Sequence, residues 1–315
     1  MVLDTGGVDD KSFNQSSWAG MTAAKAANSN IQISYVPSNS QNDYAPNLAA
    51  QHAAGCKSII AVGGLMNTAV IAAAKKNPTQ QYAEVDAPAG PSNIYGLQYN
   101  TAQGAFLGGY LAAGMSKSGK VATYGGLNIP PVTISMDGFW EGVQYYNSQN
   151  HTKVAVLGWN EKQQKQGTFA NSFTDQNKGK QISQAFIQQG ADIIFPVGGG
   201  TGLGSGAAAQ SSGGKVAVIW VDTDGCVSAP QYCPVFLTSV LKNLTDSVTK
   251  YVTAAAGGTF PTGSYIGTLA NKGTGLAPYH DYTTKVSDGL QRQLIAVAGD
   301  VASGKIVITS PSQPK

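Results

Sequence analysis

The sequence is poor in charged residues. Of its 315 residues 12% are charged, and 20 basic against 17 acidic side chains leave a net charge of +3. A charge this small, scattered along the chain, does not predict binding to nucleic acid or to an anionic membrane. The hydrophobic share of 42% suffices for a packed core, which excludes a disordered chain.

Long apolar segments are missing as well. No run approaches the ~20 apolar residues of a membrane span, and no basic-then-apolar signal peptide precedes the first expected strand. Met1 leads directly into Val2 and Leu3. We therefore expect an exported protein shown without its signal, although a cytosolic protein would look the same.

Only three cysteines are present. Cys226 and Cys233 enclose six residues, a spacing that a disulfide can close, and disulfides are typical of exported proteins. The sequence leaves open whether this pair is oxidised. Cys56 precedes the apolar run 58–62 and is expected to be a small buried side chain.

The signatures of several enzyme classes are absent. There is no Walker loop, no nucleophile elbow and no His-Glu-x-x-His motif, so the sequence does not predict catalysis. The histidines, His52, His151 and His280, have no carboxylate or thiol at metal-ligand spacing along the chain. We predict neither a metal site nor a cofactor.

Apolar runs alternate with segments rich in Ala, Gln and Lys. The runs predict buried strands, and the segments between them predict helices. This alternation implies right-handed crossovers and parallel sheets, so the predicted fold class is α/β. The expected strands are residues 31–36, 58–62, 82–85, 94–97, 120–124, 154–157, 192–197, 216–221, 235–237 and 265–269. The expected helices are residues 16–27, 68–76, 100–116, 138–147, 178–189, 204–210, 243–256 and 288–302.

A chain of 315 residues exceeds the ~250–300 residues that one core supports, so we expect two Rossmann-like lobes. The polar segment 117–119 lies between two rounds of the alternation. The predicted first lobe comprises residues 1–118 and about 240–262, and the second comprises residues 119–239 and about 263–315. Hinge strands join them in this prediction, and a ligand cleft lies between them.

In open parallel sheets, ligands bind beyond the carboxyl ends of the strands. The strand ends of this sequence carry acids and glycines rather than apolar residues. They supply Asp4, Gly6, Gly7, Gly63, Gly64, Asp86, Gly125, Gly126, Gly198, Gly199, Gly200, Asp222 and Asp224. These residues are the first candidates for a binding site.

The segment 4–14 (DTGGVDDKSFN) resembles the opening motif of the basic membrane lipoprotein family, the nucleoside-binding receptors of bacterial ABC importers. The family has the type I periplasmic-binding fold, a two-lobed Venus flytrap. Further matches follow in family order at residues 100–113, 125–130, 137–142, 172–178, 190–194, 199–204, 221–224 and 238–243. The resemblance spans almost the whole chain.

The resemblance implies roles for single residues around the nucleobase of the ligand. Phe13 and Phe173 would sandwich the base, one from each lobe, and a stacked ring contributes about 1–3 kcal/mol. Asp10 and Asn14 would hydrogen-bond to the base edge. Asp86 is a weaker candidate.

At the ribose, the resemblance implies that Asp222 accepts hydrogen bonds from the hydroxyls. Lys242 would reach the ligand or hold that carboxylate, and the backbone around Gly200 is a weaker candidate. The family also implies a monomer, lipid-anchored at the extracellular face of the membrane, that delivers a nucleoside, with a purine favoured, to an ABC permease.

Two segments depart from the family pattern. Residues 159–169 extend the loop before Phe173, which leaves Trp159 and Phe169 as rivals for the stacking role. The pair Cys226 and Cys233 follows the acidic strand end, and both segments would border the cleft.

Other interpretations stay open. Asp10 and Asn14 also fit helix caps, whereas Trp18, Trp140, Phe106 and Tyr110 are expected in the core. Residues 202–207 satisfy the loose Gly-x-Gly-x-x-Ala dinucleotide pattern, so an NAD-dependent enzyme is one alternative. A sugar receptor of the same fold is another, and a regulator acting through a partner is a third. No arginine is placed to clamp an amino acid, because Arg292 lies in the last expected helix.

Overall fold

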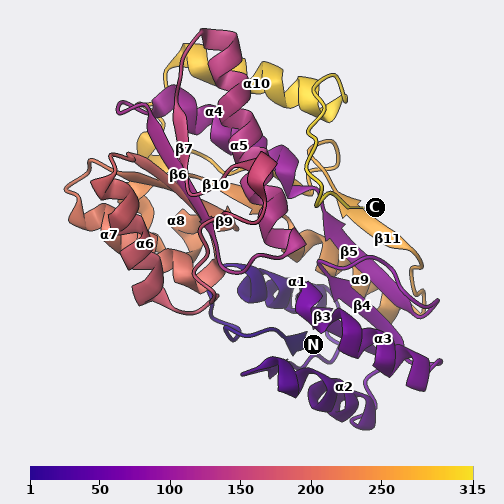
Figure 1. Cartoon of the computed structure of the whole chain (residues 1–315). Helices are drawn as coiled ribbons and strands as arrows, with labels where there is room; N and C mark the ends of the chain where they lie inside the picture. The colour runs from indigo at the N-terminus through magenta and orange to yellow at the C-terminus, as the bar shows by residue number, and fades with distance from the viewer. Residues whose placement is uncertain (315) are drawn as a thin grey trace. The chain divides into compact units, whose positions relative to one another are not determined.

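The computed structural model describes residues 1–314 and divides the chain into two compact units (Figure 1). Unit 1 contains Met1–Tyr99 and Asn243–Gly267, and unit 2 contains Asn100–Lys242 and Thr268–Gln313. The chain therefore passes from one unit to the other after Tyr99, after Lys242 and after Gly267. Each unit is built around one six-stranded sheet.

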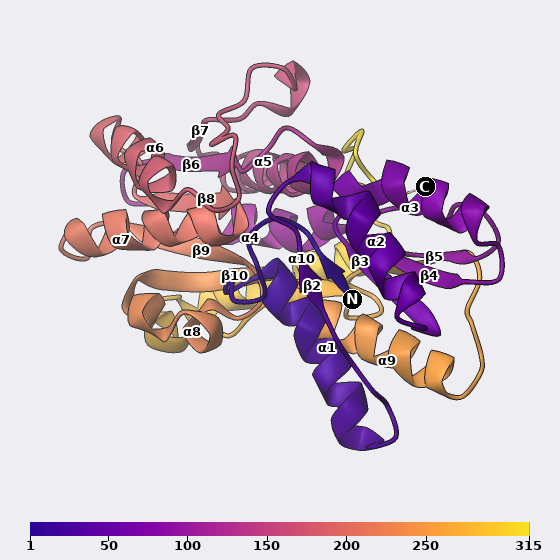
Figure 2. The same ribbon diagram turned by 90° about the horizontal axis from the view of Figure 1, so that it is seen from below.

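Unit 1 has an all-parallel sheet in the order β11-β5-β4-β3-β1-β2. Its strands are β1 (Val2–Leu3), β2 (Val36–Pro37), β3 (Ser58–Val62), β4 (Gln81–Val85), β5 (Ile94–Tyr99) and β11 (Ser264–Gly267). Its helices are α1 (Phe13–Ala27), α2 (Tyr44–Ala53), α3 (Asn67–Lys76) and α9 (Leu244–Ala256). Helices α1 and α9 lie side by side (Figure 2).

Unit 2 repeats this order as β12-β10-β9-β8-β6-β7, with only β12 antiparallel to its neighbour. Its strands are β6 (Lys120–Gly125), β7 (Ala155–Leu157), β8 (Ile193–Val197), β9 (Ala217–Asp222), β10 (Phe236–Lys242) and β12 (Thr274–Leu276). Its helices are α4 (Thr101–Met115), α5 (Pro130–Asn150), α6 (Gln176–Gln188), α7 (Leu203–Ser211), α8 (Gly225–Ser228) and α10 (Asp288–Ala302).

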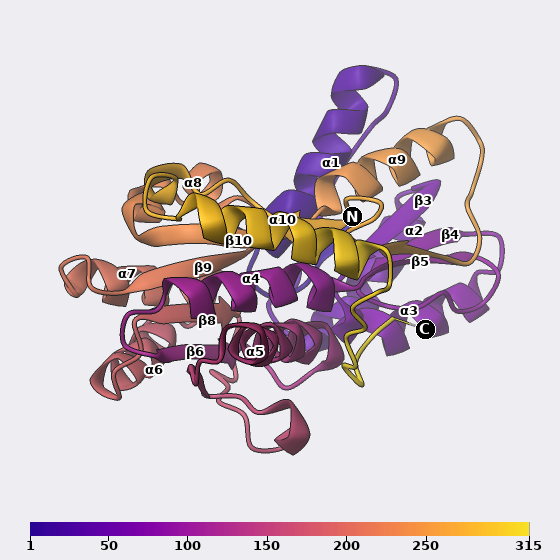
Figure 3. The ribbon, with the colours of Figure 1, turned by 90° about the horizontal axis from the view of Figure 1, so that it is seen from above.

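Helices cover both faces of each sheet. Because the side chains of a strand point alternately to the two faces, both sets of side chains are buried. In β3, Ile60 and Val62 pack in the cluster that includes residues of α1 and α9, whereas Ile59 and Ala61 pack in the cluster of α2 and α3. In unit 2, α4, α5 and α10 cover one face and lie in a row (Figure 3), while α6 and α7 cover the other. This burial explains why the strands are nearly continuous apolar runs.

The predicted α/β class is confirmed, and most predicted elements are found within a few residues of their expected ends. The strand expected at 31–36 is reduced to β2, because its partner β1 is itself only two residues long. Helix α5 begins eight residues before the predicted range 138–147, at Pro130, where a proline fits the first helical turn. Helix α2 was not predicted.

Two of the four aromatic residues expected in the core are fully enclosed. Phe106 and Tyr110 are 2% and 3% exposed, whereas Trp18 and Trp140 are partly exposed at the margins of their clusters. Within residues 1–314, none of the helices combines the length and the apolar character that crossing a membrane would require.

The segment 117–119, predicted as the joint between the lobes, lies inside unit 2 between α4 and β6. The grouping differs from the prediction because α4 packs backbone to backbone on α5. A Cβ atom on Gly109 would lie 2.0 Å from the carbonyl oxygen of Phe139, and one on Gly142 would lie 2.0 Å from that of Phe106. These glycines bring the two helices together and so place residues 100–118 in unit 2.

We expect Gly109→Ala to lower the unfolding free energy by about 1–3 kcal/mol, because the added methyl group overlaps the backbone of α5. The matched control is Gly299→Ala in α10, where a Cβ meets nothing within 4 Å. The control should raise stability by up to about 1 kcal/mol through helix propensity. Chemical denaturation measures both, and equal effects would contradict the close α4–α5 packing.

Candidate functional site

In unit 1 the candidate residues gather where β1, β3 and β4 end. Asp4 follows β1, is 7% exposed, and accepts hydrogen bonds from the Thr5 backbone N–H at 2.6 Å and from the Tyr44 hydroxyl. Burial raises the pKa of its carboxyl group. A Cβ atom on Gly63, at the end of β3, would lie 2.7 Å from the Asp4 carboxylate, so this position needs glycine. We call this region the unit 1 edge.

Asp10 is a helix cap. Its carboxylate accepts hydrogen bonds from the backbone N–H groups of Ser12, Asn14 and Gln15 at 3.0, 2.8 and 3.1 Å. These are N–H groups of the first turn of α1 and the residue before it, which have no partners within the helix. The cap interpretation of Asp10 is therefore confirmed, and its ligand role stays a prediction.

Asn14 has a different environment. Its side chain is 1% exposed, and its Nδ2 donates to the carbonyl oxygen of Asp4 at 3.4 Å. Its Oδ1 is a buried acceptor with no hydrogen-bond partner among the residues described. An unpaired buried acceptor costs about 1–3 kcal/mol, which a donor on a ligand would recover. Phe13, next to it at the first position of α1, is partly buried against the core of unit 1.

Two of the candidate aspartates share an uncommon backbone conformation. Asp86 directly follows β4 with φ 63°, and Asp222 ends β9 with φ 67°. Positive φ is uncommon for residues other than glycine, and such outliers concentrate at functional sites. Both aspartates lie at the carboxyl ends of strands that hold the same place in their sheets.

In unit 2, two glycines at the end of β6 make room for two aromatic rings. A Cβ atom on Gly125 would lie 2.7 Å from the ring of Phe169, and one on Gly126 would lie 2.4 Å from the ring of Phe173. The segment around Phe169 runs beside β6, since Thr168 and Ala170 exchange backbone hydrogen bonds with Gly125. Because Gly125 and Gly126 have no side chains, both phenylalanine rings can lie directly against the backbone at the end of β6.

The rivals of Phe173 are differently placed. Trp159 is 3% exposed, and its indole N–H donates to Asp137 at 2.9 Å, so it belongs to the core. Phe169 packs edge-on against Trp159, with ring centroids 5.9 Å apart. Phe173 and Phe169 are both partly exposed, whereas Trp159 is buried. The structure therefore excludes Trp159 as the stacking residue and leaves Phe169 and Phe173 as candidates.

The turn after β8 fixes the backbone of Phe173. This turn is the 3₁₀ helix η4 (Gly199–Gly202), in which Gly200 is buried. The Thr201 backbone N–H donates to the carbonyl oxygen of Phe173, and the Thr201 hydroxyl donates to that of Ser172, both at 3.0 Å. Phe173 and Gly200 are therefore brought to one edge of unit 2.

Asp222 and Lys242 form a nearly buried ion pair on adjacent strands. The Lys242 Nζ lies 3.8 Å from the Asp222 Oδ1, and the two side chains are 7% and 11% exposed. The parallel register of β9 and β10 places Leu241 opposite Asp222, which brings the next residue within reach. Because the pair is nearly shielded from solvent, separating the two groups would leave a buried charge without compensation, and this keeps them together. With Phe173 and Gly200 it forms the unit 2 edge.

The glycines of the dinucleotide-like segment 202–207 have packing roles. Cβ atoms at Gly202, Gly204 and Gly206 would lie 2.9 Å from Trp220, 2.0 Å from the carbonyl oxygen of Gln176 and 2.7 Å from Tyr232. All three contacts are with protein on neighbouring elements. The close packing of α7 therefore accounts for the pattern without a bound dinucleotide.

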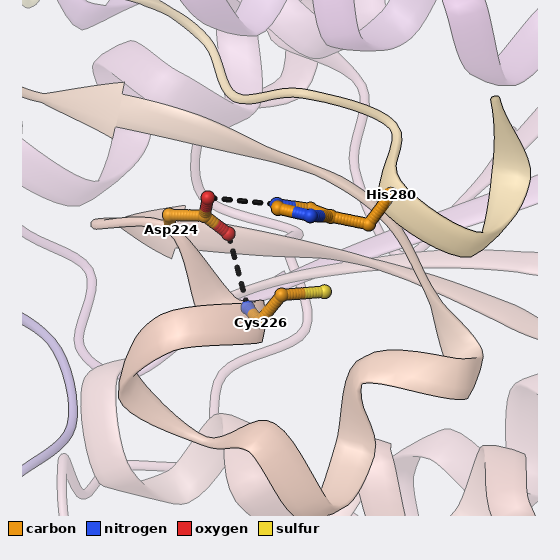
Figure 4. Close-up of side chains that lie close together, drawn as sticks. All are labelled: Asp224, Cys226 and His280. Carbon is orange, nitrogen blue, oxygen red and sulfur yellow. Dashed lines mark hydrogen bonds and ion pairs between the residues drawn. The ribbon is translucent and has the colours of Figure 1, made fainter.

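Sequence spacing did not reveal a further cluster in unit 2. Cys226 and Cys233 form a disulfide, and the His280 Nε2 lies 2.8 Å from the Asp224 Oδ2 (Figure 4). His280 was predicted to be isolated, but the fold brings it to Asp224 across 56 residues of sequence. Cys56 is the free cysteine of the described chain and is only partly buried, not fully buried as expected.

Comparisons with known proteins agree on one family. Residues 1–297 match the family model described as ABC transporter substrate-binding protein, PnrA-like. The CD4+ T-cell-stimulating antigen of Listeria monocytogenes is 32% identical, covering 90% of this chain and 81% of the relative. The ABC transporter nucleoside-binding protein BmpA of Lactococcus lactis is 28% identical, covering 98% and 88%.

Solved structures share the fold. A solute-binding protein of an ABC transporter system from Aeropyrum pernix superposes with a TM-score of 0.87 at 23% identity, covering 98% of this chain and 92% of that one. A second one, from Conexibacter woesei, gives 0.72 at 19% identity, covering 98% and 97%. These likenesses confirm the predicted two-lobed periplasmic-binding architecture.

Beneath Asp86, β4 carries a buried acid that gives a pH prediction. Glu84 is fully buried, Asn67 Nδ2 donates to its Oε2 at 2.9 Å, and burial raises its pKa to about 8. The unfolded carboxyl titrates near 4.5, so the folded state binds more protons between pH 4.5 and 8, and stability falls as pH rises through this range.

Glu84→Gln removes this titration. From pH 5 to pH 8, we expect the unfolding free energy of the unchanged protein to fall by on the order of 2–4 kcal/mol relative to that of the variant. Chemical denaturation at both pH values measures the difference. A stability difference that stays constant over this range would contradict a protonated Glu84.

Proposed function

This chain belongs to the family of PnrA-like substrate-binding proteins of ABC transporters, and we propose that its ligand is a nucleoside, with a purine nucleoside favoured. Proteins of this family bind a solute for a membrane permease and are not enzymes. The observation that carries the nucleoside proposal is the pairing of an aromatic ring with polar groups at the edge of each unit.

The two edges offer complementary chemistry for a base. Phe13 and Phe173 each present a ring on which a base face can stack, and stacking contributes about 1–3 kcal/mol. The buried acceptor Asn14 Oδ1 suits an N–H donor on the base edge. We propose that one ligand engages both edges, so that contacts from both units favour a closed state.

The ribose is assigned to the acidic strand end of unit 2. The Asp222 carboxylate can accept hydrogen bonds from sugar hydroxyls, and Lys242 stabilises its charge. Gly200 offers buried backbone beside Phe173. Asp86 holds the equivalent strand end in unit 1 and is proposed as a further polar contact. Asp10, which caps α1 beside Asn14, is also proposed as a contact for the base edge.

The setting follows from the family. The lactococcal relative is named a nucleoside-binding protein, which supports the same ligand class here. We propose a monomer held by a lipid anchor at the extracellular face of the membrane. The closed, ligand-bound form would dock on the permease and release the nucleoside there.

A thermal-shift screen of ligand-stripped protein tests the ligand class. The compounds are nucleosides, nucleobases, ribose and other sugars, amino acids and NAD. A ligand at 100 times its Kd adds about 2.7 kcal/mol of stability, so we expect a clear and selective shift with nucleosides. A shift with sugars alone would replace the ligand, and a shift with NAD alone would revive the dinucleotide interpretation.

Variants test the two aromatic contacts. We expect Phe13→Ala and Phe173→Ala each to weaken nucleoside binding about tenfold or more in calorimetry, because each removes one stacked ring. Phe173→Trp should retain binding, since its ring still stacks. Phe169→Leu is the matched control beside the same strand end. If Phe169→Leu weakens binding and Phe173→Ala does not, the stacking role passes to Phe169.

A further inference from the structure

We propose that the Cys226–Cys233 disulfide masks a zinc site. Once this bond is reduced, the two thiolates together with Asp224 and His280 would bind one Zn²⁺. The cluster lies in the connection that follows Asp222 at the end of β9, together with the 3₁₀ helix η6 (His280–Tyr282). The inference is independent of which solute the protein binds.

The spacing of the side chains supports the site. The ligand atoms of Asp224, Cys226 and His280 all lie within 4.8 Å of one another. In a tetrahedral zinc site, neighbouring ligand atoms are about 3–4 Å apart, so a small contraction suffices. Figure 4 shows the Asp224 carboxylate between the His280 ring and the backbone nitrogen of Cys226. Its Oδ2 lies 2.8 Å from the His280 Nε2, and its Oδ1 accepts a hydrogen bond from the Cys226 backbone N–H at 3.0 Å.

The disulfide decides how many ligands are available. A thiolate binds metal ions, whereas in the oxidised state each sulfur is bonded to the other. The oxidised cluster therefore offers only Asp224 and His280, too few for a closed zinc site. Reduction adds Cys226 and Cys233 and gives four ligands, the number of a structural zinc site, in a mixture of sulfur, nitrogen and oxygen that suits Zn²⁺.

The segment that carries the ligands is anchored by more than the disulfide. A Cβ atom on Gly225 would lie 2.7 Å from the ring of Phe236, and the Gly225 backbone N–H donates to the Ser239 hydroxyl at 3.0 Å. Ala229 is fully buried, and Tyr232 packs against Phe236. We therefore expect the ligands to stay together after reduction.

His280 is held in place as well. Its φ of 43° lies in the left-handed region, which is costly for a histidine and indicates a conformation imposed by its surroundings. The next residues fix it, because the Thr283 backbone and hydroxyl both donate to the His280 carbonyl oxygen and Tyr282 is buried. These contacts hold the backbone, and the contact with Asp224 orients the ring.

The redox step balances with a dithiol as reductant. The dithiol supplies two electrons and two protons, is itself oxidised to a disulfide, and leaves Cys226 and Cys233 as thiols. Each thiol then loses its proton as its sulfur binds the metal, so zinc binding releases two protons. Thiol–disulfide exchange with a small-molecule disulfide reverses the step. That disulfide takes up the two electrons and two protons and becomes thiols, while Zn²⁺ is released and the Cys226–Cys233 bond is restored.

The experiment uses the full chain with Cys56→Ser, which leaves Cys226 and Cys233 as its only thiols. The protein is reduced with a phosphine, freed of reductant without oxygen, and titrated with Co²⁺ and then Zn²⁺. We expect about one Co²⁺ per reduced chain, with thiolate-to-metal absorption that Zn²⁺ abolishes. The oxidised protein should bind neither ion at the same concentrations.

Variants separate the proposed site from a simple thiol pair. His280→Ala and Asp224→Asn should each weaken Zn²⁺ binding by the reduced protein about tenfold or more. Mutating residues that only orient the metal ligands already lowers metal affinity by about tenfold or more, so losing a ligand should cost at least as much. Asp224→Asn keeps an oxygen to cap α8. The matched control, His151→Asn, changes an exposed histidine at the end of α5 in a conformation that asparagine tolerates, and should bind as before.

Three results would overturn the proposal. The first is that the reduced protein binds no more metal than the oxidised one. The second is that its affinity for Zn²⁺ does not change in either His280→Ala or Asp224→Asn. The third applies if circular dichroism shows that reduction unfolds the chain. In that case the proposal is contradicted unless Zn²⁺ restores the thermal transition of the reduced protein and does not restore that of its His280→Ala variant.

Discussion

Each unit depends on a sheet whose two faces are both covered by helices. The backbone polar groups of its inner strands are paired with neighbouring strands, and the side chains on both faces pack in apolar clusters. Apart from Glu84 in β4, the charged side chains of the buried strands are therefore found at or near the strand ends. This constraint explains why Asp4, Asp86, Asp222 and Lys242 all follow or end strands, and why both candidate edges have the same origin.

The repeated strand order strengthens this interpretation. Because β4 and β9 hold the same place in their sheets, Asp86 and Asp222 are equivalent positions, and both have positive φ. A residue other than glycine in this conformation costs about 1–2 kcal/mol. The same conformation at matching strand ends supports the proposal that both carboxylates contact the ligand.

The sequence predicted the fold well where burial leaves a clear pattern. The predicted range 58–62 matches β3 and the range 288–302 matches α10, because a strand buried on both faces and a helix with one apolar stripe are both visible in a single chain. Helix α2 was missed because only Tyr44 and Leu48 are buried, too few for an apolar stripe.

The candidate site was predictable only in part. The motifs predicted Phe13, Phe173 and Asp222 as candidates, but the structural roles of their neighbours became clear only from the three-dimensional structure. Asp10 turned out to cap α1, and Trp159 to be a core residue. The contact between His280 and Asp224 depends on the return of the chain through β12, which no local pattern reveals.

Most of the glycines in the family motifs act through packing. Those of α4 and α5 bring two helix backbones together, those at the end of β6 make room for Phe169 and Phe173, and those of 202–206 fit α7 against its neighbours. Such positions fix the fold and the placement of the site without selecting a ligand. Under the proposed function, the choice of solute depends on the few side chains at the two edges, so receptors can keep this architecture while differing in what they bind.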